Sequence, residues 1–322
     1  MLKVSVVVAT YNGEQFIKGQ LDSILNQTYP IYEVIVKDDG STGNTVAIVK
    51  EYTETYPIVH LVKNDINMGI TSNILSGFYM AQGDYIAYSD QDDIWISNKI
   101  EKLLSAIGEK NLIYSNSAIC DQDGKYVAPL ITKEILVSEI VSILDLIVWG
   151  HQLLFKRDIL YSNDVCGLSK HIWFDSLLPI LAFRGDNKNV VYLDEMLVSW
   201  RRHPKASSFS PRLHKLRIFD DYIGVLKAIF SWFDINKRKN VQIFYKRMKD
   251  IRGLSEDTYR VIDLMSSCTF FDVIKAGIIC LRNYVDSFPQ IPLRLKIRLF
   301  LKPFFVIRNQ SKGICLDSML KL

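Results

Sequence analysis

Short hydrophobic runs and longer segments with helical periodicity alternate along the first 120 residues. The runs are rich in valine and isoleucine and read as strands, whereas the segments between them place apolar side chains three or four positions apart and predict helices. The expected strands are residues 3–9, 32–37, 59–63, 84–89 and 112–116, and the expected helices are residues 14–26, 44–56, 70–80 and 97–107. This order predicts an α/β fold with a mainly parallel sheet flanked by helices.

Polar loops follow the first, second and fourth of the expected strands. They are residues 10–13, 38–42 and 90–93, and the last two are rich in aspartate. In open α/β sheets, ligands bind beyond the carboxyl ends of the strands. The three aspartates at 90–93 repel one another, so a divalent cation that bridges to a phosphate-bearing ligand is an economical partner for them. A solvated acidic turn or a helix N-terminus is the competing interpretation.

The second half of the chain is less regular and more basic. Residues 1–200 carry 15 Lys and Arg against 25 Asp and Glu, a net charge of −10, whereas residues 201–322 carry 24 against 10, a net charge of +14. We therefore expect a catalytic domain over residues 1–208 and a basic amphipathic helical extension over residues 209–322. The basic region includes residues 293–308, and up to Pro303 their helical spacing places apolar side chains beside a Lys/Arg face, which suits a helix lying on a membrane surface. A helix that packs on the body of the protein is the alternative.

Cysteine usage and hydrophobic length indicate where the protein works. The five cysteines are scattered and none forms a CxxC pair, which fits a reducing compartment and no zinc site. The N-terminus shows no signal peptide, and no run reaches the roughly 18 to 20 uncharged apolar residues that span a bilayer. We expect a cytoplasmic protein with peripheral association at the inner face of the cell membrane. Nucleic-acid binding is disfavoured, because the basic region lacks the motif of a known module.

Five motifs occur in an order that resembles glycosyltransferase family 2. They are VSVVVATYNG at 4–13, LNQTYP at 25–30, EVIVKDDGSTGNT at 33–45, NMGITSN at 67–73 and GDYIAYSDQDDIW at 83–95. The resemblance is strong over residues 1–120 and looser over residues 145–205. It implies the Rossmann-like GT-A fold and inverting, metal-dependent transfer from a nucleoside-diphosphate sugar, a UDP- or dTDP-sugar, to a hydroxyl of a saccharide or lipid-linked acceptor.

The form of the last motif narrows the subgroup that the chain resembles. SDQDDIW is most similar to bacterial transferases for surface polysaccharides such as capsule or O-antigen, including rhamnosyltransferase-like members. The resemblance therefore implies a hexosyl- or deoxyhexosyltransferase.

The resemblance also assigns the donor and metal site. The family's DxD motif corresponds to Asp90-Gln91-Asp92, with Asp92 on the metal and Asp90 on the metal or the ribose; the ion is Mn²⁺ or Mg²⁺. Asp39 corresponds to the residue that accepts a hydrogen bond from a pyrimidine ring, and Tyr11 stacks on the base. The full set expected to bind the nucleotide sugar is Thr10, Tyr11, Asn12, Asp38, Asp39, Gly69, Asn73, Asp90, Gln91 and Arg202. Ordinary turn roles compete for Asp38 and Gly69. A helix N-cap is the expected role of Asp93, with a supporting acid of the site as the alternative.

The expected second-half residues depart more from the family pattern. Trp200-Arg201-Arg202-His203 resembles an aromatic-Arg-x-His segment, which implies that His203 binds the metal or the diphosphate and that Arg202 offsets phosphate charge. Inverting transfer needs a base that deprotonates the acceptor hydroxyl. The family's His-Asp pair is incomplete here, and Asp175 is the expected base, with His171 as the alternative.

Two competing functions remain open on the sequence. A nucleotidyltransferase would also use a metal and acidic residues, but residues 10–14 lack its Gly-rich, basic phosphate loop. A binding or scaffold protein that kept the fold and lost catalysis is favoured by the incomplete His-Asp pair. Intact Asp90 and Asp92 disfavour that scaffold.

Overall fold

The computed structural model describes residues 1–131, 138–144, 148–170, 172–204, 226–287 and 293–309. The chain divides into two compact units. The first unit comprises residues 1–136, 148–165 and 188–209, and the second comprises residues 137–147, 166–187 and 210–322. All nine described strands belong to the first unit.

A single sheet organises the first unit. Its strands are β1 (Val4–Thr10), β2 (Glu33–Asp38), β3 (Val59–Lys63), β4 (Tyr85–Ser89), β5 (Ile94–Trp95), β6 (Leu112–Cys120), β7 (Tyr126–Pro129), β8 (Leu153–Lys156) and β9 (Val190–Arg201). The strand order is β3-β2-β1-β4-β8-β6-β9-β5, and β7 pairs with β6 outside this path. The five strands expected from the hydrophobic runs are all present.

The sheet is parallel in its first half and mixed as a whole. The pairs β2·β3, β1·β2 and β1·β4 are parallel, as the alternation of strands and helices predicts. Beyond β4 the pairs β4·β8, β6·β8, β6·β7 and β5·β9 are antiparallel, whereas β6·β9 is parallel. Of the antiparallel pairs, only β6 and β7 are joined by a short connection, from Cys120 to Tyr126, which is too short for the crossover that a parallel pair needs.

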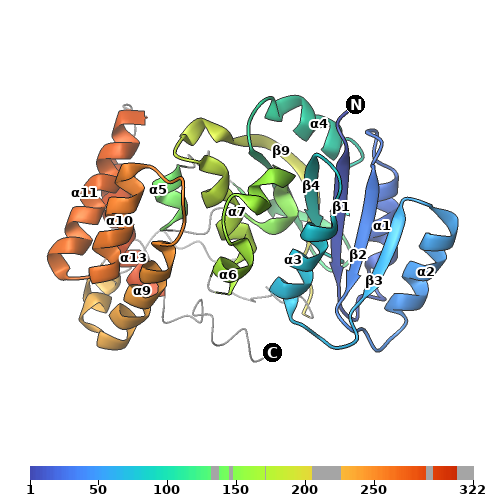
Figure 1. Cartoon of the computed structure of the whole chain (residues 1–322), viewed down its shortest axis with the longest axis horizontal. Coiled ribbons are helices and arrows are strands. Elements are labelled where there is room, and N and C mark those ends of the chain that lie inside the picture. Colours follow the sequence, from blue (N-terminus) through green and yellow to red (C-terminus); the bar gives the residue numbers. More distant parts are fainter. Residues whose placement is uncertain (132–137, 145–147, 171, 205–225, 288–292, 310–322) are drawn as a thin grey trace. The chain divides into compact units, whose positions relative to one another are not determined.

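Helices cover both faces of this sheet (Figure 1). The core on one face joins Val6 and Val8 of β1 to residues of α1 (Ile17–Leu25), α2 (Thr45–Thr55) and α4 (Lys99–Ile107). On the other face α3 (Ile70–Met80) packs through Phe78, whose ring lies 6.0 Å from Tyr88 and 5.3 Å from Phe155. Because both faces are buried, β1 is a continuous hydrophobic run rather than an alternating one.

The second unit is helical. Its helices are α5 (Glu139–Ser142), α7 (Phe174–Phe183), α9 (Ile235–Met248), α10 (Glu256–Ser267), α11 (Phe270–Ser287), α12 (Leu293–Phe300) and α13 (Lys302–Asn309), with the 3-10 helix η4 (Ser231–Phe233); a further short helix, α6 (Val165–Ser169), begins at the boundary with the first unit. The buried carboxylate of Glu139 accepts hydrogen bonds from the N–H groups of Gly185 and Ser255 and from the Thr258 hydroxyl. Tyr245 of α9 donates its hydroxyl to the carbonyl of Ile143.

Each compact unit consists of several separate stretches of the chain. The sequence instead predicts two continuous domains with one boundary after residue 208. Residues 137–147 and 166–187 group with the C-terminal helices and not with the sheet. The reason is the set of long-range hydrogen bonds made by Glu139 and Tyr245, which span more than 100 residues and leave no mark on local periodicity.

Where a surface helix is expected from residue 293 up to Pro303, the structure has α12, which ends at Phe300, and the start of α13. Their apolar residues Leu299, Phe304 and Ile307 are buried, while Leu293 and Ile297 are exposed. Much of the apolar face therefore packs within the unit, as in the packed-helix alternative. Among the described residues, no helix is both long enough and apolar enough to cross a bilayer.

Candidate functional site

Three loops meet at one edge of the sheet. Thr10 at the end of β1 pairs with Asp38 at the end of β2, and Val8 pairs with Ser89 at the end of β4. Since β2, β1 and β4 are adjacent and parallel, the segments that follow them share the carboxyl edge of the sheet. The three polar loops therefore lie at the same edge of the sheet, as the sequence predicts.

Gln91 joins the acidic motif to the loop after β1. Its side-chain carbonyl oxygen accepts the Thr10 hydroxyl at 2.7 Å and the Tyr11 N–H at 2.9 Å, and its amide group donates to the Tyr11 carbonyl at 3.3 Å. A Cβ at Gly13 would displace the Gln91 side chain from this position. The Tyr11 side chain remains exposed.

Asn12 joins the same loop to the segment after β2. It has a positive φ of 49°, a conformation that asparagine tolerates better than most residues. Its N–H donates to the Ser41 hydroxyl at 2.8 Å, and its side-chain oxygen accepts the Thr42 N–H at 3.0 Å. Asn12 thus braces two loops of the candidate site.

Asp38 and Asp39 have different roles. Asp38 is fully buried and accepts the N–H and the hydroxyl of Ser41, as in the expected turn role. Asp39 accepts the N–H groups of Met68 and Gly69, at 2.8 and 3.0 Å. Gly69 has a φ of +83° and precedes α3, so Asp39 holds the helix entry against the end of β2.

Asn73 lies below this loop rather than on its surface. It is 2% exposed, donates to the Lys37 carbonyl at 2.9 Å and accepts from the Asn64 amide at 2.9 Å. Asn64 in turn donates to Asp39 and accepts from the Lys37 ammonium group. Asn73 and Lys37 therefore hold Asn64, and through it Asp39, in a buried network of hydrogen bonds.

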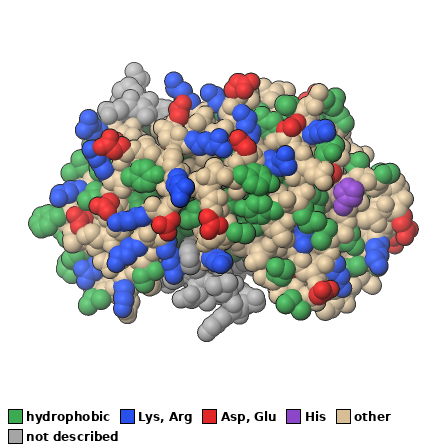
Figure 2. Space-filling model, viewed as in Figure 1, with side chains coloured by type: hydrophobic (Ala, Val, Ile, Leu, Met, Phe, Trp, Pro, Cys, Tyr) green, Lys and Arg blue, Asp and Glu red, His purple; other side chains and the backbone are tan. Residues whose placement is uncertain are grey.

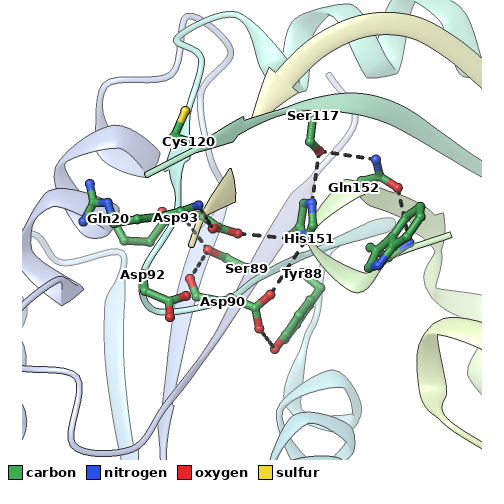
Figure 3. A network of polar contacts seen from close by, with 12 residues as sticks. Gln20, Tyr88, Ser89, Asp90, Asp92, Asp93, Ser117, Cys120, His151 and Gln152 are labelled. Carbon is green, nitrogen blue, oxygen red and sulfur yellow. Dashed lines mark hydrogen bonds and ion pairs between the residues drawn. The ribbon is translucent and has the colours of Figure 1, made fainter. Parts of the chain in front are cut away.

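The side chains of Asp90 and Asp92 have different partners, and Figure 3 shows the Asp90 carboxylate directed toward Tyr88 and His151. The Asp92 carboxylate meets His203 Nε2 at 2.8 Å, and the imidazole packs on the Phe16 ring, with centroids 4.5 Å apart. The Asp90 carboxylate accepts the Tyr88 hydroxyl at 2.6 Å and lies 3.9 Å from His151 Nδ1. The guanidinium of Arg202 stacks on Trp200, 4.3 Å from its centroid.

Asp93 is not the helix N-cap that the sequence predicts. Asn98 occupies that position before α4, and residues 94–95 form β5 instead. Asp93 is fully buried; one oxygen accepts the Arg201 N–H at 3.1 Å, and the other accepts no hydrogen bond from the described residues. The prediction was wrong because β5 pairs with β9, a contact from residues 100 positions away.

A buried cation and an imidazole lie beside these carboxylates. Lys99 is fully buried, donates to the His151 carbonyl at 2.7 Å and lies 3.8 Å from the Trp95 ring centroid. His151 is 2% exposed and contacts the Ser117 hydroxyl through Nε2 at 3.0 Å. No sequence pattern predicts a role for Lys99 or His151, because their burial depends on contacts between distant segments.

Burial dominates the electrostatics of this cluster. It raises the pKa of the Asp90 and Asp93 carboxyls, and the neighbouring carboxylates add to both rises. Burial also lowers the pKa of Lys99 to about 7, against the opposing effect of Asp93 and Asp90. For His151, burial and the charges of Lys99 and Arg202 lower the pKa to about 3. A neutral imidazole is the form that binds metals.

Two donor sets are therefore candidates for a divalent ion. One oxygen each from Asp90 and Asp93 and a nitrogen of His151 lie within 4.8 Å of one another. Asp92 and His203 form the other set, and they match the expected metal ligands except that Asp90 points toward His151. Carboxylate oxygens with an imidazole fit Mn²⁺ or Mg²⁺, and the buried Asp93 oxygen is an acceptor that such an ion would satisfy.

The expected catalytic base lies in the second unit. Asp175 is in the first turn of α7, where the helix dipole favours a carboxylate. His171, the alternative base, lies outside the described residues.

Comparison with known proteins identifies relatives. Residues 5–162 match the family model described as Glycosyl transferase family 2. Over 131 residues the chain is 35% identical to an Escherichia coli protein, UDP-Glc:alpha-D-GlcNAc-diphosphoundecaprenol beta-1,3-glucosyltransferase WfgD, covering 39% of this chain and 51% of that protein. It is 25% identical to the poly(ribitol-phosphate) beta-glucosyltransferase of Bacillus spizizenii over 97% of this chain and 50% of that protein.

The chain thus spans about half the length of these two relatives. A solved structure of S. aureus TarS residues 1–349 in complex with UDP-GlcNAc superposes with a TM-score of 0.58 at 18% identity, covering 97% of this chain and 91% of that one. At this identity the likeness shows a shared fold.

Proposed function

Because the chain belongs to glycosyltransferase family 2 through residues 5–162 and has the GT-A fold, we propose that it transfers a sugar from a nucleoside-diphosphate sugar to an acceptor hydroxyl in bacterial surface-polysaccharide synthesis. The observation that carries this proposal is the convergence of Asp92 with His203 beside Gln91, at the carboxyl edge of β1 and β4. The relatives named above support it, since their names describe transfer of glucose to lipid-linked or polymeric acceptors.

Metal dependence is part of the proposal. Asp92 and His203 would hold Mn²⁺ or Mg²⁺. Asp90 would become a third ligand if its side chain rotated away from the Tyr88 hydroxyl. A bound ion supplies positive charge that stabilises the departing nucleoside diphosphate. Arg202, fixed by stacking on Trp200, would add a second positive charge for the phosphates.

The donor is proposed to be a UDP- or dTDP-sugar. Asp39 is an acceptor held in place by the N–H groups of Met68 and Gly69, and a uracil or thymine ring presents an N–H donor that suits it. The exposed Tyr11 ring is available to stack on the base. The TarS structure with UDP-GlcNAc is consistent with a uridine donor. A hexose or a deoxyhexose such as rhamnose is the proposed sugar.

The transfer is proposed to invert the anomeric centre. An inverting reaction needs one base to take the proton of the attacking hydroxyl. Asp175 is the proposed base, and His171 remains the alternative. The proposed acceptor is a saccharide or a lipid-linked saccharide. The proposed location is the cytoplasm at the inner face of the membrane, with the basic helices α12 and α13 facing anionic lipid.

A thermal-shift panel of UDP, dTDP, GDP and CMP, each with Mn²⁺ or with EDTA, tests the proposal first. A ligand at about 100 times its dissociation constant stabilises the folded state by roughly 2.7 kcal/mol. We expect a metal-dependent shift with UDP or dTDP that Asp92→Asn abolishes, whereas the exposed control Asp65→Asn retains it. Folded protein that responds to no nucleotide would contradict the transferase and favour a scaffold that has lost catalysis.

A further inference from the structure

Five aromatic rings from two separate segments form a continuous row in the second unit. In η4 and just before it, the Phe233 ring lies 6.4 Å from Phe230 and 5.3 Å from Trp232, measured between centroids. At the start of α11, Phe270 lies 5.2 Å from Trp232 and 6.3 Å from Phe271. We call these five residues the aromatic row.

The row presents its outer rings to solvent. Phe230, Phe233 and Phe271 are 65%, 64% and 72% exposed, and the nearby Ile235 is 70% exposed. Single exposed hydrophobic residues are common on protein surfaces, but a contiguous apolar patch of this kind marks an interaction site.

The inner rings of the row are fixed to the unit. Trp232 donates its indole N–H to the Cys268 carbonyl at 3.2 Å. Phe270 packs against the buried Phe304 of α13, with centroids 5.9 Å apart. The exposed phenylalanines are therefore presented by an ordered base formed by η4, the α10–α11 turn and α13. Such a base reduces the conformational entropy lost when the rings enter another phase.

The surroundings of the row are positive. Residues 226–240 contain Lys227, Lys237, Arg238 and Lys239 against one acid, Asp234, a net charge of 4 − 1 = +3. Asp234 is engaged as the N-cap of α9, where it accepts the Lys237 N–H at 3.1 Å. Asp272, beside Phe271, accepts the hydroxyls of Ser267 and Thr269. Figure 2 shows Lys and Arg side chains interspersed with hydrophobic ones over the helices of this unit.

We propose that the aromatic row is a membrane-insertion edge that enters the interfacial layer of an anionic lipid bilayer. Phenylalanine and tryptophan side chains are typical of the apolar face of segments that lie at the boundary between headgroups and acyl chains, and clustered Lys and Arg side chains favour anionic headgroups. Exposed rings surrounded by Lys and Arg side chains fit an anionic bilayer better than they fit a partner with a neutral apolar surface. The edge differs from the α12 and α13 helices, whose apolar residues are largely buried, and it goes beyond the proposed sugar transfer.

Flotation of the full chain with lipid vesicles tests the edge without any nucleotide sugar. Vesicles of phosphatidylcholine alone are compared with vesicles that contain phosphatidylglycerol, each at low and high salt. We expect binding to the anionic vesicles to weaken at least 10-fold in the triple variant Phe230→Ser, Phe233→Ser and Phe271→Ser. The matched control replaces three exposed apolar residues of the first unit by serine, at Ile66, Tyr126 and Tyr161, and should bind like the wild type.

A second variant separates insertion from a folding defect. Phe233→Trp keeps an aromatic ring at the edge and should show a blue shift of tryptophan emission on adding anionic vesicles, larger than that of the wild type. The charge variant Lys227→Gln, Lys237→Gln and Lys239→Gln should lose the preference for anionic vesicles.

Three outcomes would overturn the proposal. Wild-type protein that does not float, or a serine triple variant that floats like the wild type, excludes the row as an insertion edge. A triple variant that changes oligomeric state in light scattering, with vesicle binding unchanged, identifies the row as a contact between protein chains. Since flotation needs neither donor nor metal, its failure leaves the nucleotide-binding test of the proposed function unaffected.

Discussion

His203 Nε2 lies 2.8 Å from Asp92 Oδ2, although 111 positions of sequence separate the two residues. β9 makes this contact, because it runs alongside β6 and pairs with β5 directly after the acidic motif. The Arg201 N–H bond to Asp93 fixes the end of β9 two residues before His203. The strand pairing of β9 therefore positions His203 next to Asp92.

Removing either partner of this contact should weaken metal-dependent nucleotide binding. Asp92→Asn and His203→Gln should each reduce UDP affinity in the presence of Mn²⁺ by roughly 10- to 100-fold or more. Loss of a residue that only hydrogen-bonds to a metal ligand already costs that much. Isothermal titration calorimetry with Mn²⁺ and with EDTA provides the measurement. In EDTA the variants and the wild type should bind UDP equally, because the metal contribution is gone.

Two further variants complete that experiment. His60→Gln replaces an exposed histidine of β3 and should leave the affinity unchanged. His151→Gln distinguishes the two candidate donor sets: it should retain the metal dependence if the ion binds at Asp92 and His203. Loss of metal dependence in His151→Gln alone would instead place the ion at Asp90 and Asp93.

Replacing Lys99 should destabilise the protein, because its buried neighbours would lose their hydrogen-bond donor and counter-charge. Lys99→Met removes the hydrogen bond to the His151 carbonyl and the nearby positive charge that offsets Asp93. A cost of about 3 kcal/mol in the free energy of unfolding is expected, as for loss of one member of a buried charged set. Urea denaturation monitored by circular dichroism measures it.

The control for Lys99 lies one turn further along α4. Lys102 is partly exposed and pairs with Glu195, so Lys102→Met should cost less than about 1 kcal/mol. Adding Asp93→Asn to Lys99→Met should recover part of the loss, because the amide oxygen still accepts the Arg201 N–H without a buried negative charge. Equal costs for Lys99→Met and Lys102→Met would show that the contacts of the buried Lys99 contribute no more than those of the partly exposed Lys102.

Glu139 should be the most sensitive acidic residue of the second unit. Its carboxylate accepts hydrogen bonds from Gly185, Ser255 and Thr258, and hydrogen bonds to a charged group contribute about 1.5–3 kcal/mol each. Glu139→Ala should therefore destabilise the protein by about 3 kcal/mol or more in urea denaturation. Glu256→Ala, at an exposed residue of α10 paired with Arg260, should change stability by less than about 1 kcal/mol. A similar cost for both variants would contradict this role.

The described cysteines should differ sharply in alkylation by iodoacetamide. Burial raises the pKa of Cys268 to about 11 and of Cys280 to about 12, and it also raises the pKa of Cys120. A raised pKa lowers the fraction of reactive thiolate at any pH below it, so Cys268 and Cys280 should stay unlabelled at pH 9. Cys166 is exposed and should react quickly. Mass spectrometry of tryptic peptides measures each site, and 8 M urea should make all of them react at similar rates; fast native labelling of Cys280 would refute the buried assignment.

The sequence is most informative where local pattern and function coincide. The valine-rich runs predict β1 and β2 because both faces of the sheet are covered, and the polar residues at 38–42 and 90–93 therefore stand out against the hydrophobic strands. Lys99 is not predictable in this way. A lysine in the first turn of a helix after an acidic loop reads as a solvated residue, and its burial comes from His151, which is brought there by β8 and the 3-10 helix η1 (Gly150–Gln152).

The expected role of Asp93 failed for the same physical reason. An aspartate before a helix is a good N-cap on local grounds, but β5 intervenes and directs Asp93 into the interior. The grouping of residues 137–147 with the C-terminal helices also depends on contacts that skip more than 100 residues. The expected base, Asp175, stays a prediction, since it belongs to the second unit.

Gln91 has a consequence for how sequences of this type can diverge. Its side-chain carbonyl is the acceptor for both the Thr10 hydroxyl and the Tyr11 N–H. A residue without that carbonyl would leave both donors without this acceptor. If position 10 also lost its hydroxyl, only the Tyr11 N–H would lack it. Positions 91 and 10 should therefore change together among relatives, as a compensated pair of substitutions rather than as independent ones.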